Sequence, residues 1–567
     1  MRSVMRSLMQ SLARNPLVWI LILAAGLRLA GLFWGLPASD GWDDDGFAPR
    51  NFLTALALTY KSGAYFTYPP LHAIFLALLT APGIVVALLH TPSFHQADVI
   101  AEFTKPGLMT FFAVTARLAN LALSLGIIWC VGEMARLVAG RRAGLFAAGA
   151  CALNFGLTYY GQVSNLDVPC LFWGSLSLLC FMRAAVEQQP RRLWFALLSA
   201  AAAIATKDQA YGLFLLSLPV FLLVWLANAP RAQGREMVRA FLPAAAVGLF
   251  LLLLVDGAVT NPDGFVQRLH FLTGPASGDY AAYPGSWDGL LALLSDMAAW
   301  FGAGYGLPAV LLALLGLGLQ ARPGADRGRW AAGMLPALAI LSFTVCFNLA
   351  ALRTDARFLL PQAVLSCVYI GIAASWLISA SHRWARLAAC GGIAATALLA
   401  LHASLAVGAA MLQDPRYDAE AWMRAHVRPG DVIETYGQNA YLPRFPQGAT
   451  VLRVGMKPLK ARNPLHGVTE VREPFDNPRA SRYIVVNDWW LRHYTEPQSE
   501  LGGHRIPSRA QAALYGDVAA RAYFQALKGG RLAYRLTHVA APAVGPWPAV
   551  HIHESLNETI LIFERIS

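Results

Sequence analysis

Long runs of apolar residues dominate the first 410 positions of the chain. A helix needs about 20 mostly apolar residues to cross a hydrocarbon core about 30 Å thick. The runs that approach or reach this length lie near residues 17–36, 110–135, 143–160, 166–182, 193–206, 209–228, 240–258, 296–319, 330–350, 358–379 and 387–410. The pattern therefore predicts a mostly α polytopic membrane protein with about 11 transmembrane helices.

Basic residues occupy every second connection between these runs. They are Arg2, Arg6 and Arg14, then Arg136, Arg141 and Arg142, Arg183, Arg191 and Arg192, Arg231, Arg235 and Arg239, Arg322, Arg327 and Arg329, and finally His382, Arg383 and Arg386. Short loops rich in Lys and Arg stay in the cytoplasm. The alternation predicts a multi-pass protein of the inner (plasma) membrane, with a cytoplasmic N-terminus and an extracytoplasmic C-terminus.

One further apolar stretch, residues 70–90, does not fit this alternation as a crossing. A span at that point would invert every later loop and place the arginines on both sides of the membrane. We therefore expect this stretch to lie in, or dip into, the outer leaflet of the bilayer.

Composition agrees with the membrane assignment. The chain has 567 residues, of which 56% are hydrophobic and 14% charged, and its mean hydropathy is +0.46. A soluble domain does not hide so much apolar surface. The net charge of +12 is concentrated in the alternate loops, so it indicates membrane topology rather than a nucleic-acid partner. The seven cysteines all lie inside predicted spans, and no disulfide framework is expected.

The pattern divides the chain into two parts. Residues 1–410 form the membrane domain, with residues 37–109 as its first external loop, and residues 411–567 lose the span-like runs and gain charge. We expect the second part to be a small extracytoplasmic α/β domain. Its predicted elements are strands at 431–435, 482–486 and 559–563 and an amphipathic helix at 510–527.

Charged residues gather at the external ends of the predicted spans. Three consecutive aspartates, Asp43 to Asp45, follow the first span, although neighbouring carboxylates repel one another. Other loops on the same face carry Asp167, Lys207, Arg353 and Arg357. Charges near a membrane usually have a function or extend to the membrane surface. Here they suit an anionic lipid headgroup bound beside a base.

The chemistry that fits this arrangement is glycosyl transfer from a lipid-linked phosphosugar. Lys207, Arg353 and Arg357 are suited to hold the phosphate, and cations that hold it stabilise the charge of the leaving group. One aspartate can then take the proton from the acceptor hydroxyl. Its neighbour would raise the pKa of that base by repulsion or orient the acceptor.

Several short motifs resemble those of the glycosyltransferase C superfamily. They are Trp42-Asp43-Asp44-Asp45-Gly46-Phe47, Tyr68-Pro69-Pro70-Leu71, Arg28-Leu29, Thr115-Ala116-Arg117-Leu118, Gln162 to Pro169, Ala205-Thr206-Lys207 and Arg357-Phe358-Leu359-Leu360-Pro361. Their order along residues 17–410 resembles protein O-mannosyltransferases and bacterial aminoarabinose transferases. The resemblance implies an inverting glycosyltransferase that uses a polyprenyl-phosphate-linked sugar. The acceptor, a lipid, glycan or protein hydroxyl, is left open.

The resemblance also implies roles for individual residues. Asp44 would be the base or orient the acceptor, with Asp45 where many members have Glu, and Asp167 would be the second acidic group. Lys207 and Arg357 would hold the phosphate. The triplet leaves the register open, so Asp43 is a further candidate. The other candidates are Tyr68, Pro69, Pro70 and His270, the last in a third external loop at 259–295.

Structural roles remain open for the same residues. Asp45 and Asp167 are alternatively helix caps, and Lys207 alternatively extends its amine to the membrane surface. Arg353 and Arg357 alternatively form a salt bridge with Asp355. A lone charge in lipid is costly, so we expect Arg28 in the first span to pair with a carboxylate.

Two questions of function also remain open. No cofactor is certain from the sequence, and a divalent metal is left open because no tight ligand spacing such as His-x-x-x-His accompanies the aspartates. The alternative functions are a transporter or flippase, in which the acidic cluster binds a cation or proton, and a polymerase or ligase of lipid-linked glycans. A transporter places its charges near the midplane on repeated halves, whereas here they gather at one face, so the enzyme is favoured.

Overall fold

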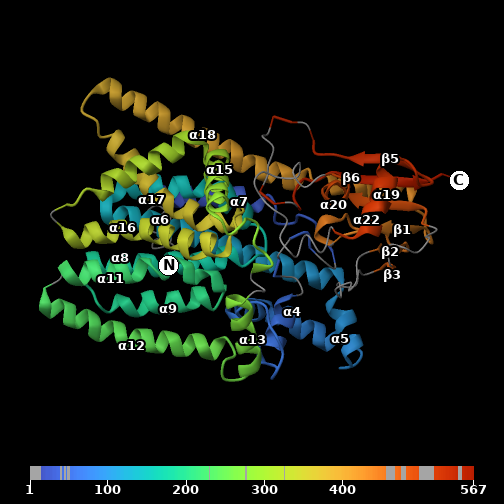
Figure 1. Ribbon diagram of the computed structural model, residues 1–567, viewed down its shortest axis with the longest axis horizontal. Coiled ribbons are helices and arrows are strands. Elements are labelled where there is room, and N and C mark those ends of the chain that lie inside the picture. Colours follow the sequence, from blue (N-terminus) through green and yellow to red (C-terminus); the bar gives the residue numbers. More distant parts are fainter. Residues whose placement is uncertain are drawn as a thin grey trace, which may run out of the picture.

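The structure is a computed structural model that describes residues 15–38, 41–43, 46–47, 51–228, 230–274, 278–324, 326–437, 439–454, 467–473, 481–496, 516–543, 545–546, 552–553 and 555–566. A bundle of long helices is followed by a smaller domain built on a sheet, which sits at one end of the bundle (Figure 1). The described structure confirms the expected fold class, a mostly α polytopic chain with an α/β C-terminal part.

The helices of the bundle follow the predicted apolar runs. They are α2 (Pro16–Leu29), α3 (Asn51–Tyr60), α4 (Leu71–His90), α5 (Gln96–Phe103), α6 (Pro106–Ala152), α7 (Phe155–Tyr160), α8 (Asp167–Val186), α9 (Arg192–Ile204), α10 (Tyr211–Phe214), α11 (Ser217–Asn228), α12 (Arg231–Val255), α13 (Pro262–Thr273), α15 (Trp287–Ala321), α16 (Arg327–Phe343), α17 (Leu360–Leu377) and α18 (Arg383–Leu412). Short 3-10 turns cover Asp208–Ala210 and Arg357–Leu359, and a π-helical segment covers Thr344–Leu349.

Eight helical segments among the described residues are long and apolar enough to cross a membrane, or nine if the bent pair in α15 counts as one span. Two shorter apolar helices, α2 and α9, lie at two further predicted positions. The stretch expected in the outer leaflet forms α4, which is itself long and apolar enough to span. It lies with α5 and α13 at the end of the bundle beside the sheet domain (Figure 1). Its position relative to the bilayer stays a prediction.

Glycines mark the sharp bends in the two longest helices. Gly140 in α6 has a φ of 85°, a non-helical conformation, and it separates two helical segments in the connection expected between two predicted spans. Gly306 in α15 has a φ of 70°, and the two halves of that helix meet at 110°. A residue with a Cβ rarely adopts positive φ. A glycine at each position therefore permits the change of direction.

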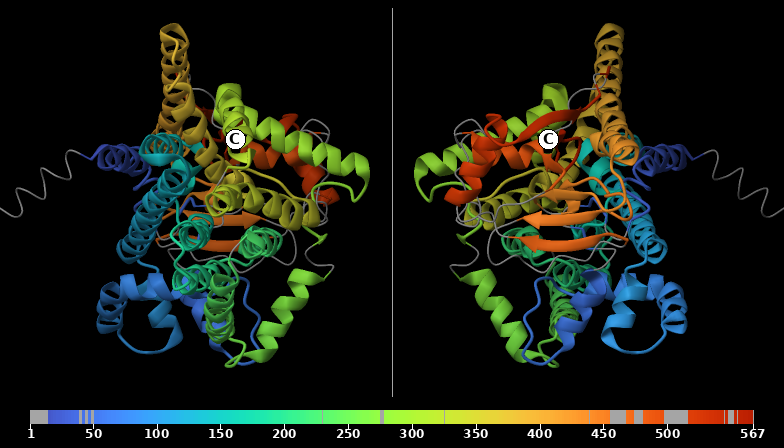
Figure 2. Two further views of the ribbon diagram at one scale, coloured as in Figure 1. Left: turned by 90° about the vertical axis from the view of Figure 1, so that its left-hand side faces the viewer. Right: turned by 90° about the vertical axis from the view of Figure 1, so that its right-hand side faces the viewer.

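Small side chains let the central helices pack closely. α6 contacts α17 and α8 along a core that contains Ala143, Ala147 and Val364. At Gly371 of α17 an added Cβ would collide with the backbone of Ala143. Small residues at such crossings allow backbones to approach and gain van der Waals contact, which drives helix association in lipid. In contrast, the first half of α18 stands away from the other helices (Figure 2) and is largely exposed.

The C-terminal part is a six-stranded mixed sheet in the order β3-β2-β1-β4-β6-β5. Strands β1 (Val432–Thr435), β2 (Thr450–Val454), β3 (Thr469–Glu473) and β4 (Tyr483–Asn487) run parallel, and β6 (Ile560–Arg565) pairs antiparallel with β4 and with β5 (Tyr534–Ala540). α19 (Pro415–His426), α20 (Asp488–Thr495) and α22 (Val518–Lys528) accompany the sheet. All three predicted strands are present. The helix expected at 510–527 falls partly outside the described residues, and its described part is α22.

Candidate functional site

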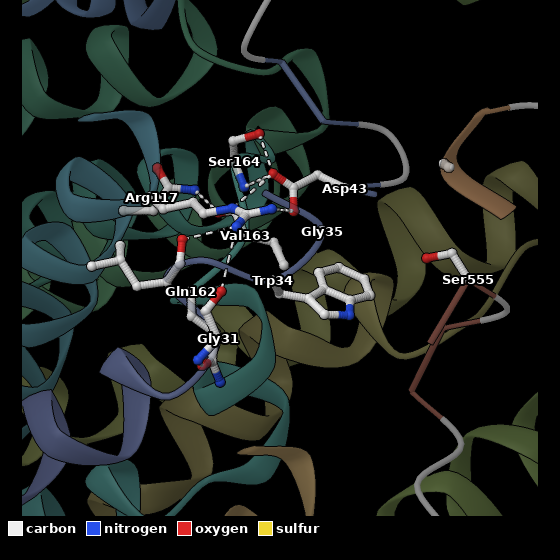
Figure 3. A network of polar contacts seen from close by, with 12 residues as sticks. Gly31, Trp34, Gly35, Asp43, Arg117, Gln162, Val163, Ser164 and Ser555 are labelled. Atoms are coloured by element: carbon white, nitrogen blue, oxygen red, sulfur yellow. Dashed lines mark hydrogen bonds and ion pairs between the residues drawn. The ribbon is translucent and has the colours of Figure 1, made fainter. Parts of the chain in front are cut away.

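The segment that follows α2 is fixed to the bundle through Asp43. Its carboxylate accepts hydrogen bonds from Nη2 and Nε of Arg117 at 2.9 and 3.2 Å and from the hydroxyl of Ser164 at 2.8 Å. Figure 3 shows these three side chains converging from the loop, from α6 and from the segment before α8. Both side chains of the ion pair are at most 1% exposed. The carboxylate of Asp43 is therefore held by the charge of Arg117 and by directed hydrogen bonds from Arg117 and Ser164.

The segment between α7 and α8 is tied to the same loop by further contacts. The Ser164 carbonyl accepts from the amide of Phe47 at 2.8 Å. The side-chain amide of Asn120 donates to the carbonyls of Val163 and Asn165, and Oε1 of Gln162 accepts from the amide of Gly31 at 2.7 Å (Figure 3). Buried backbone groups are costly to leave unpaired. These bonds therefore hold the segment that leads into Asp167.

Asp167 is the first residue of α8, and its side chain turns to the 3-10 turn that follows α9. Oδ1 accepts from Nζ of Lys207 at 2.7 Å and from Nε2 of Gln209 at 2.9 Å. Among the described residues, Oδ2 is buried without a hydrogen-bond partner. Burial alone would lower the pKa of Lys207, but the charge of Asp167, the nearby phenol of Tyr68 and the Asp167 hydrogen bond outweigh it, and the pKa is raised. Lys207 therefore stays charged in its buried position.

Three cations surround the ring of Phe358. The guanidinium carbons of Arg353 and Arg357 each lie 4.8 Å from the ring centroid, and Nζ of Lys207 lies 5.9 Å from it. The face of an aromatic ring is negative and attracts cations at such distances. Asp355 also takes part, since its Oδ2 lies 3.4 Å from Nε of Arg357. The structure thus brings together the three residues expected to bind phosphate, and it also contains the Arg357 half of the alternative salt bridge with Asp355.

The Tyr-Pro-Pro element lies next to Lys207. The amide of Leu71 donates to the carbonyl of Ala205 at 3.0 Å, where α4 begins. Tyr68 contributes to the electrostatic environment of Lys207 and contacts the ring of Phe47 with 6.4 Å between centroids. Pro69 and Pro70 are buried. Tyr68 therefore packs on Phe47 and lies near enough to Lys207 to affect its pKa.

Two of the expected acidic residues cannot be placed in this site. Asp44 and Asp45 lie outside the described residues, so their roles, including helix capping by Asp45, stay predictions. His270 is described and is an exposed side chain of α13. On the same helix, Arg268 is buried and binds Asp208 through two nitrogen atoms, and it lies 3.5 Å from Asp256.

Sequence reasoning missed the partners that hold the site together. The sequence indicates Arg117 only as part of a motif and gives no role to Ser164 or to the group of Asp208, Asp256 and Arg268. A signal for Arg268 exists, because Asp208 at the start of an apolar segment requires a compensating charge. The prediction that Arg28 pairs with a carboxylate is wrong for the described contacts. Nη1 of Arg28 donates instead to the carbonyls of Ala24 and Ala152.

A metal site is not evident in the part of the chain that the structure describes. No group of three or more His, Cys, Asp or Glu side chains there is placed to hold an ion. Asp167, one of the carboxylates considered for this role, uses Oδ1 for Lys207 and Gln209. The described residues therefore supply no ligand set, and no cofactor is assigned.

Comparison with known proteins identifies the fold. No family model and no curated protein matches the chain. The fold is similar to that of ArnT from Cupriavidus metallidurans. In its apo state that protein aligns over 96% of this chain and 97% of its own, with 14% identity and a TM-score of 0.51. At this identity, the likeness establishes the fold alone, which agrees with the fold implied by the glycosyltransferase C motifs.

Two further solved structures are less similar. ArnT from Cupriavidus metallidurans bound to undecaprenyl phosphate aligns over 84% of this chain and 93% of its own, with 16% identity and a TM-score of 0.48. The archaeal oligosaccharyltransferase AglB from Archaeoglobus fulgidus, in complex with an inhibitory peptide and a dolichol-phosphate, aligns over 75% of this chain and 62% of its own. Its identity is 14% and its TM-score 0.42.

Proposed function

We propose that the protein is an integral-membrane inverting glycosyltransferase, which moves a sugar from a polyprenyl-phosphate donor to an acceptor hydroxyl on the external face of the membrane. The observation that carries the proposal is the grouping of Lys207, Arg353 and Arg357 around Phe358, beside the buried carboxylate of Asp167. Cations in a site with little water stabilise a phosphate strongly, both bound and as a leaving group. The ArnT-like fold and the order of the motifs give further support.

The surroundings of the cations suit a lipid-linked donor. A small apolar pocket, partly open to solvent, is lined by residues that include Phe155, Trp300 and Ala356, and Ala356 is the neighbour of Arg357 in the chain. A phosphate held at the cations therefore has apolar surface nearby for the first part of its lipid chain.

Each carboxylate has a distinct place in the proposed reaction. Asp44 takes the proton of the acceptor hydroxyl as the oxygen attacks the anomeric carbon, and the bond from that carbon to the phosphate oxygen breaks. The lipid phosphate leaves with its charge held by Lys207 and Arg357. Oδ2 of Asp167, buried and without a described partner, accepts a hydrogen bond from a hydroxyl of the sugar or acceptor. Asp45 orients the acceptor.

The experiment that tests the function is transfer of radiolabelled sugar from polyprenyl phosphate by the full chain in lipid. Asp44→Asn is expected to abolish transfer at normal expression. Asp98→Asn, a carboxylate in α5 of the same external loop, is the matched control and should keep it. If both Asp44→Asn and Asp45→Asn keep full transfer, the base is assigned wrongly. If the unaltered protein transfers no sugar from any polyprenyl-phosphate donor, the function itself is wrong.

The proposal includes the location and the partners of the enzyme. The chain resides in the inner membrane with a cytoplasmic N-terminus, and residues 411–567 form an extracytoplasmic domain next to the donor site. Its acceptor is a lipid, a glycan or a protein. Labelling of single cysteines placed at Arg231 and at Arg535 tests the orientation, since only the second should react with an impermeant reagent in intact cells. Assays with and without a chelator test for a divalent ion.

A further inference from the structure

Trp42, the residue before Asp43, is held by the C-terminal domain. The guanidinium carbon of Arg416 lies 3.9 Å from its ring centroid, and that of Arg444 lies 5.4 Å from it. Tyr417 packs on the same ring with 5.0 Å between centroids. Two guanidinium groups and a phenol from one domain thus enclose one indole of another. We name Trp42, Arg416, Tyr417 and Arg444 the Trp42 clamp.

The clamp is built into the C-terminal domain. Arg416 binds Asp414 through Nε and Nη2 at 2.8 and 2.7 Å, and its Nη2 also donates to the carbonyl of Ser555 at 2.6 Å. Arg444 donates to both oxygens of Glu420. Although burial opposes its charge, the Glu420 hydrogen bonds and charge raise the pKa of Arg444. Both guanidinium planes are therefore fixed before they meet the indole.

The clamp also contacts the chain just before Trp42. The indole nitrogen of Trp34 donates to Asp414 at 3.0 Å, the amide of Gly35 donates to the hydroxyl of Tyr417 at 3.0 Å, and Arg444 donates to the carbonyl of Pro37 at 3.2 Å. Trp34 and Trp42 meet edge to face, with 5.9 Å between centroids. Both indoles are only 2% exposed.

We propose that the C-terminal domain positions the acidic end of the first external loop through the Trp42 clamp. Asp43 is anchored on its other side by Arg117 and Ser164, so the chain entering Asp44 is fixed by two different parts of the molecule. Trp42, Arg416 and Arg444 are then positioning residues that act on the aspartates through the backbone. This inference rests on the proposed function, in which those aspartates meet the acceptor.

The test compares Arg444→Ala and Trp42→Leu with the unaltered full chain in lipid. Arg444 is chosen because Arg416 is more deeply buried, so its removal would leave the Asp414 carboxylate buried without its partner. Arg482→Ala is the matched control, since Arg482 lies 5.1 Å from the ring of Tyr483 in the same domain but outside the clamp. Trp42→Phe keeps an aromatic face for the guanidinium groups and should therefore keep most of the exchange protection and most of the kcat that Trp42→Leu loses.

Two measurements are made on each variant. Hydrogen exchange of the peptide covering residues 31–47 should become faster in Arg444→Ala and Trp42→Leu and should not change in Arg482→Ala. The kcat of sugar transfer should fall by roughly 10- to 100-fold, because small displacements of a catalytic group are costly. The KM for the donor should stay unchanged, since Lys207, Arg353 and Arg357 are untouched.

The outcomes separate this inference from the proposed function. If hydrogen exchange of residues 31–47 is unchanged in both Arg444→Ala and Trp42→Leu, the proposed role of the clamp is wrong. It is also wrong if exchange becomes faster and the kcat stays unchanged. A kcat that is as low in Trp42→Phe as in Trp42→Leu also counts against the positioning role of the clamp. If the unaltered chain shows no transfer, the proposed function fails, and the exchange comparison still decides whether the C-terminal domain holds the loop.

Discussion

Nζ of Lys207 lies 2.7 Å from Oδ1 of Asp167, and the two side chains are 11% and 4% exposed. A lysine that only extends its amine to the membrane surface would be exposed at that amine, and an aspartate that only caps a helix would face the backbone. Here each compensates the buried charge of the other. A donor phosphate that binds Lys207 therefore competes with Asp167 for the same ammonium group.

Replacing Lys207 should separate the structural role of this pair from its role in transfer. Lys207→Met leaves a buried carboxylate unpaired, which costs about 3–5 kcal/mol of stability, and the same variant should lose transfer. Adding Asp167→Asn removes the uncompensated charge and should restore the thermal midpoint in detergent without restoring transfer. A double variant that recovers both would show that the pair is structural only.

Most of the helical fold follows from short-range patterns. Each predicted apolar run, such as 358–379, contains a helix, because the bilayer makes every backbone group pair within its own segment. The break in α15 is not predicted. Gly140 separates the two halves of α6 in the connection expected between two spans, whereas Gly306 breaks α15 inside an expected span. A glycine permits a bend, but only the packing of neighbouring helices decides whether one forms.

The sequence likewise predicted some residues of the candidate site and missed others. The motifs identified Asp167, Lys207 and Arg357, and the grouping of charged loops on one face added Arg353; the structure brings these residues together. The motifs did not identify what holds Asp43, because Arg117 is 74 residues away and Ser164 is 121. A pairing over such a separation leaves no local pattern. The expected partner of Arg28 was wrong for a related reason, since a carbonyl from Ala152 at the end of α6 reaches it.

The contacts of Asp43 predict that it is structural, although it belongs to the acidic triplet. Asp43→Asn leaves Arg117 buried beside a neutral partner, so the free energy of unfolding should fall by about 3–5 kcal/mol. Thermal unfolding of the purified protein measures this loss, with Asp98→Asn as the control. If Asp43→Asn keeps the unaltered thermal midpoint and abolishes transfer, Asp43 is the base, and the assignment to Asp44 is one residue too late.

The cations around Phe358 predict a defect in donor binding. Arg357→Gln removes a charge-assisted contact worth about 1.5–3 kcal/mol, so the KM for the donor should rise by about 10-fold or more. Arg383→Gln removes an arginine that lies over Trp384, in a loop expected on the opposite face, and should leave the KM unchanged. Initial rates at varied donor concentration measure both. An unchanged KM in Arg357→Gln would limit Arg357 to its ion pair with Asp355.

The group of Asp208, Asp256 and Arg268 predicts a pH-dependent stability. Burial raises the pKa of Asp256 to about 7; the charge of Arg268 opposes this shift and that of Asp208 adds to it. The unfolded chain releases this proton near pH 3.9, so between these values the folded state binds more protons. Stability from this group is then fully present below about pH 4 and is lost as the pH rises through about 7.

Asp256→Asn mimics the protonated carboxyl at every pH and tests this sign. The thermal midpoint of Asp256→Asn minus that of the unaltered protein should increase from pH 5 to pH 8, because only the unaltered protein must ionise a buried carboxyl. Asp263→Asn removes an exposed carboxylate from α13, the helix that carries Arg268, and is the matched control. A difference that stays constant across this range would mean that Asp256 is already ionised at pH 5, with Arg268 shared fully between the two aspartates.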